Sequence, residues 1–176
     1  MRALAIGICA ALLLAAGEAT AAEAPIGVVK TVKGEAYIER GQKAAPAKLG
    51  DTLREKDELV TGRDGALGVI MKDDAVLSIG ANSRLQFTDF VFEPAERKLS
   101  TVNRLKRGTL VYLSGLIAKL KPEAVRFETK TAVCGIRGTY LAIAEQDGGL
   151  RDFTEEHIAR LNAVLRGGGE KNAEEK

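Results

Sequence analysis

The sequence predicts an all-β sandwich or barrel that is followed by one C-terminal amphipathic helix. Three observations predict this fold class. The 19 glycines of the chain help to place turn signals about every ten residues, a spacing typical of short strands. Between the turns, apolar residues alternate with period two, as they do in half-buried strands. One stretch near the end of the chain has the apolar spacing of a helix instead.

Residues 1–22 have the layout of a secretory signal peptide. Arg2 is followed by an apolar run over 3–16, and small residues allow cleavage after Ala21 or Ala22. The run is too short for a membrane-spanning helix with ordinary flanks. No later segment is apolar over a spanning length, so we expect a mature chain that is exported and has no membrane span.

A hairpin is predicted in the middle of the chain. Along 66–71 ("ALGVIM") the odd-numbered residues share one apolar face, and along 75–80 ("AVLSIG") they do so again. Asp73 and Asp74 lie between the two runs and are typical of a tight turn. We expect both carboxylates to be exposed, because an acidic turn is far commoner than a calcium site.

Two further runs show the period of a strand. Val125 and Phe127 share one face of the next clear strand, "AVRFET". In "RLQFTDFVF" the apolar residues are odd-numbered up to Phe87 and even-numbered from Phe90 onward. A bulge at residues 88–89 would reconcile the two phases.

A helix is predicted over residues 152–166. Acidic residues fill its first turn, and Ile158, Leu161 and Leu165 lie on one face before three glycines end the run. A helix this short is marginal alone, so its apolar stripe needs a surface on its own domain or on a partner. The charged tail over 167–176 is expected to be disordered.

The composition excludes several classes of function. The formal charge of +2 and the export signal both argue against binding to nucleic acid. Cys134 would be the only cysteine of the mature chain, so we expect no internal disulfide. The only histidine is His157, which is too few for a His-based metal site, and no residues indicate a cofactor.

Three blocks of sequence resemble the FecR family in the order that the family has them. They are "LGDTLREKDELVTGRDG", "LSIGANSRL" and "GIRGT", and the resemblance extends over about Val32 to Ile143. The resemblance implies a jelly-roll-like β-sandwich over 26–146. It also implies a periplasmic role in envelope signalling or ligand sensing, without catalysis.

The chain departs from the family's pattern in several ways. The full-length regulator carries an anti-sigma region, a transmembrane helix and a part that meets an outer-membrane transporter; we expect a stand-alone secreted form without them. Lys56 stands where the family usually has glycine, and Asp74-Ala75 replaces a usual Gly-Ser turn. Tyr140 stands where an acidic residue often follows "RGT", so a function of that carboxylate does not carry over.

Cys134 is predicted to be a packing residue and not a nucleophile. A nucleophilic thiolate needs a base or a cationic setting, and no local signature joins His157 to Cys134. Ala132, Cys134 and Ile136 share parity, and free cysteine is among the most buried residue types. Two neighbouring glycines, Gly135 and Gly138, would allow the close backbone approach that goes with pairing of Arg137 inside the domain. The structural motif is therefore assigned to Cys134, Gly135 and Gly138.

Arg137 has a structural and a functional interpretation. It shares parity with an otherwise apolar set of positions over 133–143, where a cation is costly unless it is paired. Pairing within the domain, with turn carbonyls or a carboxylate such as Glu128 or Asp64, is favoured. The alternative is an anion contact to a sugar acid or a partner's carboxylate. The candidate binding residues are therefore Arg137, Thr139 and Tyr140.

Taken together, these observations favour a non-catalytic periplasmic binding or regulatory module that engages an envelope protein partner. No acid–base pair, nucleophile or metal set converges, which argues against an enzyme. The alternative is a module that binds cell-wall or surface polysaccharide. The aromatic content of 5% weighs against it, because sugars generally stack on aromatic rings.

Overall fold

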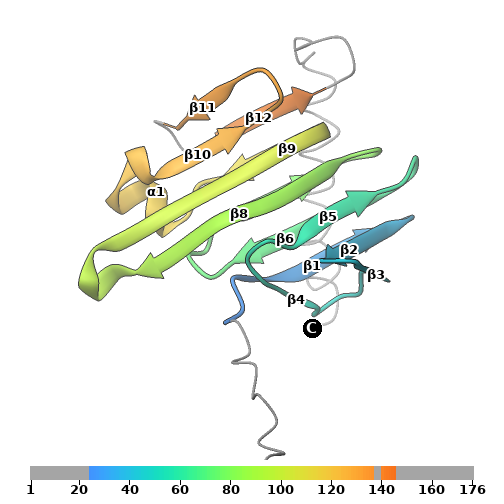
Figure 1. The fold of residues 1–176 in the computed structure, drawn as a ribbon, viewed down its shortest axis with the longest axis horizontal. Coiled ribbons are helices and arrows are strands. Elements are labelled where there is room, and N and C mark those ends of the chain that lie inside the picture. Colours follow the sequence, from blue (N-terminus) through green and yellow to red (C-terminus); the bar gives the residue numbers. More distant parts are fainter. Residues whose placement is uncertain (1–23, 137–139, 146–176) are drawn as a thin grey trace, which may run out of the picture.

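The fold is described by a computed structural model that covers residues 24–136 and 140–145 (Figure 1). The strands are β1 (Gly27–Lys33), β2 (Ala36–Arg40), β3 (Lys43–Pro46), β4 (Thr52–Leu53), β5 (Glu58–Thr61), β6 (Ala66–Met71), β7 (Val76–Ile79), β8 (Arg84–Glu93), β9 (Lys98–Leu113), β10 (Val125–Glu128), β11 (Val133–Gly135) and β12 (Tyr140–Glu145). The helices are α1 (Leu116–Leu120) and two short 3-10 helices, η1 (Pro94–Glu96) and η2 (Pro122–Ala124).

One long strand, β9, belongs to two halves of a single sheet. Over Lys98–Arg107 it pairs with β8, and its other neighbour there is the parallel strand β10. Over Gly108–Leu113 it pairs with β12, and it also pairs with β7. We call β3, β2, β5, β8, β10 and β11 with the first part of β9 the β8 half. The β7 half is β12, β7, β6, β1 and β4 with the second part of β9.

The all-β prediction is confirmed, whereas the jelly-roll sandwich is not. A sandwich would have two separate sheets, but β9 runs for 16 residues through both halves of one curled sheet. The junction lies at Gly108, whose φ of 91° is a conformation that glycine adopts without steric cost. A Cβ at Gly108 would also lie 2.2 Å from the Ser83 hydroxyl oxygen. The curled sheet therefore depends on glycine at this point.

The core follows the predicted period of two. The odd-numbered residues of β6 and β7 lie in the core, as do Val125 and Phe127 of β10. Antiparallel pairing of β6 with β7 places Val69 opposite Leu77. The predicted hairpin and the predicted apolar faces are therefore confirmed.

The change of apolar phase in β8 is a β-bulge. The register of β8 against β9 shifts between Phe87 and Asp89, where the sequence predicts it. Phe87 is 1% exposed and Phe90 is 8% exposed, so the inserted residue keeps both rings on the inner face.

The turn between β6 and β7 differs from the prediction in one respect. Asp74 is exposed and has a φ of 65°, but Asp73 is only 1% exposed. The Asp73 carboxylate accepts hydrogen bonds from the backbone N–H groups of Ala75 and Ile117, both at 3.2 Å. The prediction of two exposed carboxylates is therefore wrong, because Asp73 is used to hold α1 against this turn.

Several predicted segments lie outside the described residues. They are the signal peptide over 1–22, the helix over 152–166 and the tail over 167–176. The short helix α1 was not predicted, since five residues are too few to display a helical period. Within the described ranges, no helix is long and apolar enough to cross a membrane.

Candidate functional site

The stretch 131–143 is divided between the two halves of the sheet. β11 pairs with β10 in the β8 half, and β12 pairs with β9 in the β7 half. Val133 is 68% exposed, whereas Ile143 is 4% exposed. The prediction that these positions share one apolar face is therefore wrong, because parity holds only within one continuous strand.

Cys134 is half-buried and packs against the core. It lies opposite Phe127 in the pairing of β11 with β10, and Ile136 is buried nearby in the chain. No atom of the described residues lies within 4 Å of the position that a Cβ of Gly135 would take. The close approach predicted at Gly135 and the packing role of Cys134 both stay predictions.

The candidate binding residues are described in part. Arg137 and Thr139, together with Gly138, lie outside the described residues, so their roles stay predictions. Tyr140 begins β12 opposite Leu113 and is 41% exposed. Glu128, which was considered as a partner for Arg137, accepts hydrogen bonds from two nitrogens of Arg104, at 2.6 and 2.9 Å.

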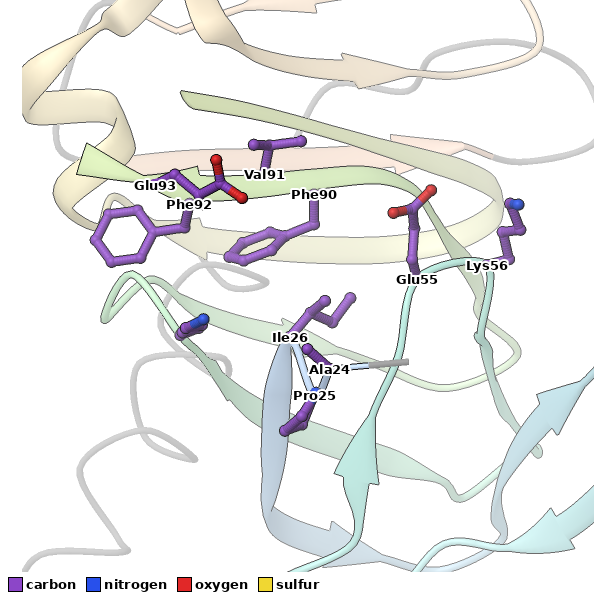
Figure 2. A pocket seen from close by; sticks show the side chains of 10 residues that line it. Ala24, Pro25, Ile26, Glu55, Lys56, Phe90, Val91, Phe92 and Glu93 are labelled. Carbon is purple, nitrogen blue, oxygen red and sulfur yellow. The ribbon is translucent and has the colours of Figure 1, made fainter. Parts of the chain in front are cut away.

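A groove of about 320 Å³ opens beside the second part of β8 and was not predicted. It is lined by residues 24–26, 55–56, 72 and 90–93. Figure 2 shows the rings of Phe90 and Phe92 pointing from β8 into this space on the side of Ile26, while Val91 points the other way. Its volume lies at the small end of the range for ligand sites, roughly 300–1,000 Å³.

The groove combines an apolar floor with a charged rim. Phe90 is 8% exposed and Ile26 is 5% exposed. The ionisable residues of the lining carry two charges of each sign: Glu55, Lys56, Lys72 and Glu93. The arrangement therefore suits the binding of apolar side chains between polar edges.

An ion pair between the partly exposed Arg40 and the buried Asp57 fixes the turn that forms one wall of the groove. Asp57 is 0% exposed, and its carboxylate accepts hydrogen bonds from two nitrogens of Arg40, both at 2.7 Å, and from the Arg54 N–H at 2.8 Å. The Lys56 N–H donates to the Phe87 carbonyl oxygen at 2.7 Å. Lys56 itself has a φ of 67°, a conformation that favours glycine.

Two of the three blocks that resemble the FecR family are joined by a network of hydrogen bonds. The Thr61 hydroxyl donates to the Gly80 carbonyl oxygen at 2.6 Å and accepts from the Ser83 N–H at 2.9 Å. The Ser83 hydroxyl oxygen accepts from the Thr109 N–H at 2.9 Å. The side chains of Thr61 and Ser83 therefore join β5, the turn after β7 and the Gly108 junction of β9, which is a structural role.

Two groups that are buried inside the fold have raised pKa values. Burial raises the pKa of the Asp73 carboxyl, although hydrogen bonds from Ile117 and Ala75 oppose the shift. Burial, and then the charge of Asp73, raises the pKa of Tyr112 to about 12. Over the described part of the chain, no three His, Cys, Asp or Glu side chains are grouped so that they could hold a metal ion.

The groove could have been found from one signal in the sequence. The phase change in 84–92 puts Phe90 and Phe92 on the inner face beyond the bulge, although β8 is by then approaching its end. Large aromatic residues at the end of an apolar face often line an opening of the core. Nothing in the sequence around Glu55 and Lys56 indicates that this turn faces them.

Comparison with known proteins gives one match. The family described as FecR protein matches residues 57–156, which is more than half of the 176 residues. No curated protein and no solved structure matches the chain. The match begins later than Val32, where the resemblance begins, and it includes β8 with its groove wall. FecR domains are regulatory modules of the cell envelope, and by this match the chain belongs to the FecR family.

Proposed function

We propose that this protein is a non-catalytic periplasmic module that binds an envelope protein partner in sensing or signalling. Membership of a regulatory family supports the proposal. The main observation behind the proposal is the groove beside β8, because aromatic side chains that line a desolvated pocket are frequent anchors of protein–protein interfaces. Phe90 and Phe92 supply such a surface, and the balanced rim suits a polypeptide better than a polyanion.

A polysaccharide partner is the less favoured alternative. Sugar-binding surfaces usually present neighbouring aromatic rings. Among the described residues, the exposed aromatic side chains are Tyr37 at 37% and Tyr140 at 41%. Tyr37 lies on β2 in the β8 half and Tyr140 on β12 in the β7 half, so the two rings do not form one platform.

Site-specific photo-crosslinking in intact cells tests the proposal. A photoreactive phenylalanine analogue at Phe92 should give one protein adduct of defined mass, and this adduct should disappear when Phe90→Glu is added. The same analogue at Tyr37, an exposed aromatic of similar size, serves as the matched control. Equal adduct patterns at both positions would contradict a partner at the groove. Retention of the protein on purified peptidoglycan at low salt, without adducts, would favour the alternative.

The proposal includes export with removal of residues 1–22. Cleavage after Ala21 or Ala22 would place the new N-terminus within a few residues of Ala24, which lines the groove. The intact mass of the protein recovered from the periplasmic fraction checks this step. A mass that retains residues 1–22 would contradict it.

We also propose that residues 152–166 form a helix that covers the outer face of the β7 half. Val28, Ile70, Val76, Leu113 and Tyr140 pair in turn across five strands and form an apolar ladder on this outer face. The ladder crosses four strand spacings, about 19 Å, and a helix of this length spans about 22 Å. The apolar stripe of Ile158, Leu161 and Leu165 would then lie along the ladder.

The burial of other residues on this face supports a cover. Val111 and Ser78 alternate with core residues and so point outward, yet they are 2% and 3% exposed. Val111 is buried without belonging to the core cluster. The last described strand, β12, ends at Glu145 in the same half, so the segment that follows starts beside the face it would cover.

A further inference from the structure

β8 has an open side along its second part. Its neighbour β5 pairs with Arg84–Gln86, and the contact ends at Phe87, which bonds to the backbone of Lys56 and Asp57. Beyond Phe87, no described residue makes a backbone hydrogen bond to this side of β8. The open side therefore runs from the bulge to Glu93, along the groove.

The backbone groups that face this opening can be identified from the pairing on the other side of β8. The Phe87 N–H donates to the Asp57 oxygen at 3.0 Å, so the backbone of Phe87 points away from β9. The register shifts between Phe87 and Asp89, and the alternation of an antiparallel pair beyond this bulge assigns the bonds to β9 to Asp89 and Val91. The N–H and C=O groups of Phe90 and Phe92 therefore point toward the open side.

The same two residues also direct their rings into the groove (Figure 2). Backbone donors and acceptors two residues apart, next to apolar pockets, match the repeat of an extended chain, roughly 6.6 Å per two residues. We propose that the groove binds an extended segment of a partner protein, which adds a strand to the open side of β8. Alternate side chains of that segment would enter the pocket formed by Phe90, Phe92 and Ile26.

Other edges of the described sheet are less suited to such a partner. β3 contains Pro46 and is exposed at all four positions, β4 has two residues and β11 has three. Short, charged or proline-containing edges are ways in which proteins avoid strand addition. The open part of β8 is longer than β4 or β11, contains no proline and presents two aromatic residues, so it is the edge at which a strand partner would gain both hydrogen bonds and burial.

The inference rests on the proposed function, since it names the form of the partner at the same groove. It is tested with a matched pair of variants in the processed chain, residues 23–176. Phe92→Val removes the ring but keeps the N–H, whereas Phe92→Pro removes the ring and the N–H. This N–H faces the open side, so proline costs no hydrogen bond of the sheet and is tolerated at such an edge. Circular dichroism is measured first, to check that both variants fold.

The probe is a displayed library of random nonapeptides, selected on the immobilised protein. A selected peptide, made synthetically, should bind Phe92→Pro at least about tenfold more weakly than Phe92→Val, the loss of roughly one well-made hydrogen bond in a desolvated site. It should also slow amide exchange at Phe90 and Phe92 in the unchanged protein, a readout that does not depend on either variant folding.

Three outcomes would overturn the proposal that a partner adds a strand to β8. Equal affinity for the valine and proline variants would show that the N–H of residue 92 makes no bond to the peptide. Slow amide exchange at Phe90 and Phe92 before any peptide is added would mean that the chain itself covers the edge. A dimer of the processed protein that Phe92→Pro dissociates would assign the edge to a second copy. If a partner still crosslinks at Phe92 alongside any of these results, the proposed function stands. Only the proposal that the partner adds a strand to β8 is then wrong.

Discussion

The carboxylate of Asp73 lies 3.2 Å from the backbone nitrogen of Ile117, 44 residues later in the chain, and accepts its hydrogen bond. The carbonyl oxygen of Asp73 accepts a second bond from the Leu116 N–H at 2.7 Å. Gly115 precedes these donors, and a Cβ there would lie 2.4 Å from the same carbonyl oxygen. The turn between β6 and β7 therefore caps α1, and glycine is needed for the approach.

The titration of Asp73 should make the protein lose stability as pH rises through the acidic range. Burial raises the pKa of Asp73 in the folded state above its ordinary value of 3.8. Between these two pKa values the folded chain binds more protons than the unfolded chain, so the free energy of unfolding falls with rising pH and levels off above the folded pKa. Asp73→Asn should remove this component in thermal unfolding measured from pH 3 to pH 7.

Asp74→Asn is the matched control for this pH series. It makes the same chemical change one residue later, at a carboxyl that is exposed. Its unfolding curve should keep the pH dependence of the unchanged protein. If both variants retain the same pH dependence as the parent, another carboxyl is responsible and the role given to Asp73 is wrong.

Replacing Lys56 by glycine should stabilise the protein. Lys56 has a φ of 67°, and the left-handed conformation costs a residue with a Cβ roughly 1–2 kcal/mol. Glycine avoids this cost but loses more freedom on folding, about 0.5–1 kcal/mol. The net gain should be about 0.5–1 kcal/mol in urea denaturation. Lys33→Gly, at the end of β1, should lose stability instead, and a loss in both variants would contradict the strain at Lys56.

The sequence predicts these local features better than the way in which they meet. The alternation in β6, β7 and β10 and the bulge in β8 are visible as parity, because they depend on neighbours in the chain. Lys56 and Asp74, which depart from the FecR pattern at turns, both have positive φ. The resemblance therefore located two positions where the backbone favours glycine.

The arrangement of the two halves is not visible in parity. Val133 and Ile143 have the same parity, yet they lie on strands of different halves, because residues 137–139 separate two strands and parity is lost across a break. The burial of Asp73 depends on N–H groups of α1, and the groove depends on the turn at Glu55 facing β8. Both are contacts between distant segments, which no single stretch of sequence encodes.

Replacing Thr61 by valine should lower the free energy of unfolding by about 1–3 kcal/mol, the cost of leaving buried polar groups unpaired. The Thr61 hydroxyl serves the Gly80 carbonyl and the Ser83 N–H, and valine has nearly the same shape without the oxygen. Thr52→Val, at the exposed residue of β4, is the control and should change stability little. Equal effects of the two substitutions in urea denaturation would contradict a structural role of the hydrogen bonds made by Thr61.

Two arginine variants should separate an ion pair whose carboxylate is fully buried from one whose carboxylate is partly exposed. Arg40→Met leaves the fully buried Asp57 carboxylate with the Arg54 N–H in place of three donors. We expect a loss of about 1–3 kcal/mol, because the Arg40 side chain is itself 44% exposed and water replaces part of the contact. Arg104→Met breaks the exposed pair with Glu128 and should cost at most about 1 kcal/mol. Chemical denaturation of both variants measures the two losses in the free energy of unfolding. A larger loss for Arg104→Met than for Arg40→Met would contradict the prediction.

The cover proposed for the β7 half predicts how a thiol placed beneath it will react. In a Cys134→Ser background, Val111→Cys should react slowly with a maleimide, because Val111 is 2% exposed on the outer face of the sheet. Adding Leu161→Glu puts a charge on the apolar stripe of the proposed helix and should raise the rate by at least about tenfold, since a buried charge costs several kcal/mol. Asn162→Glu makes the same addition off the stripe and should leave the rate unchanged. If Leu161→Glu and Asn162→Glu give the same slow rate, residues 152–166 do not cover this face, and a partner or a second copy becomes the occupant to test.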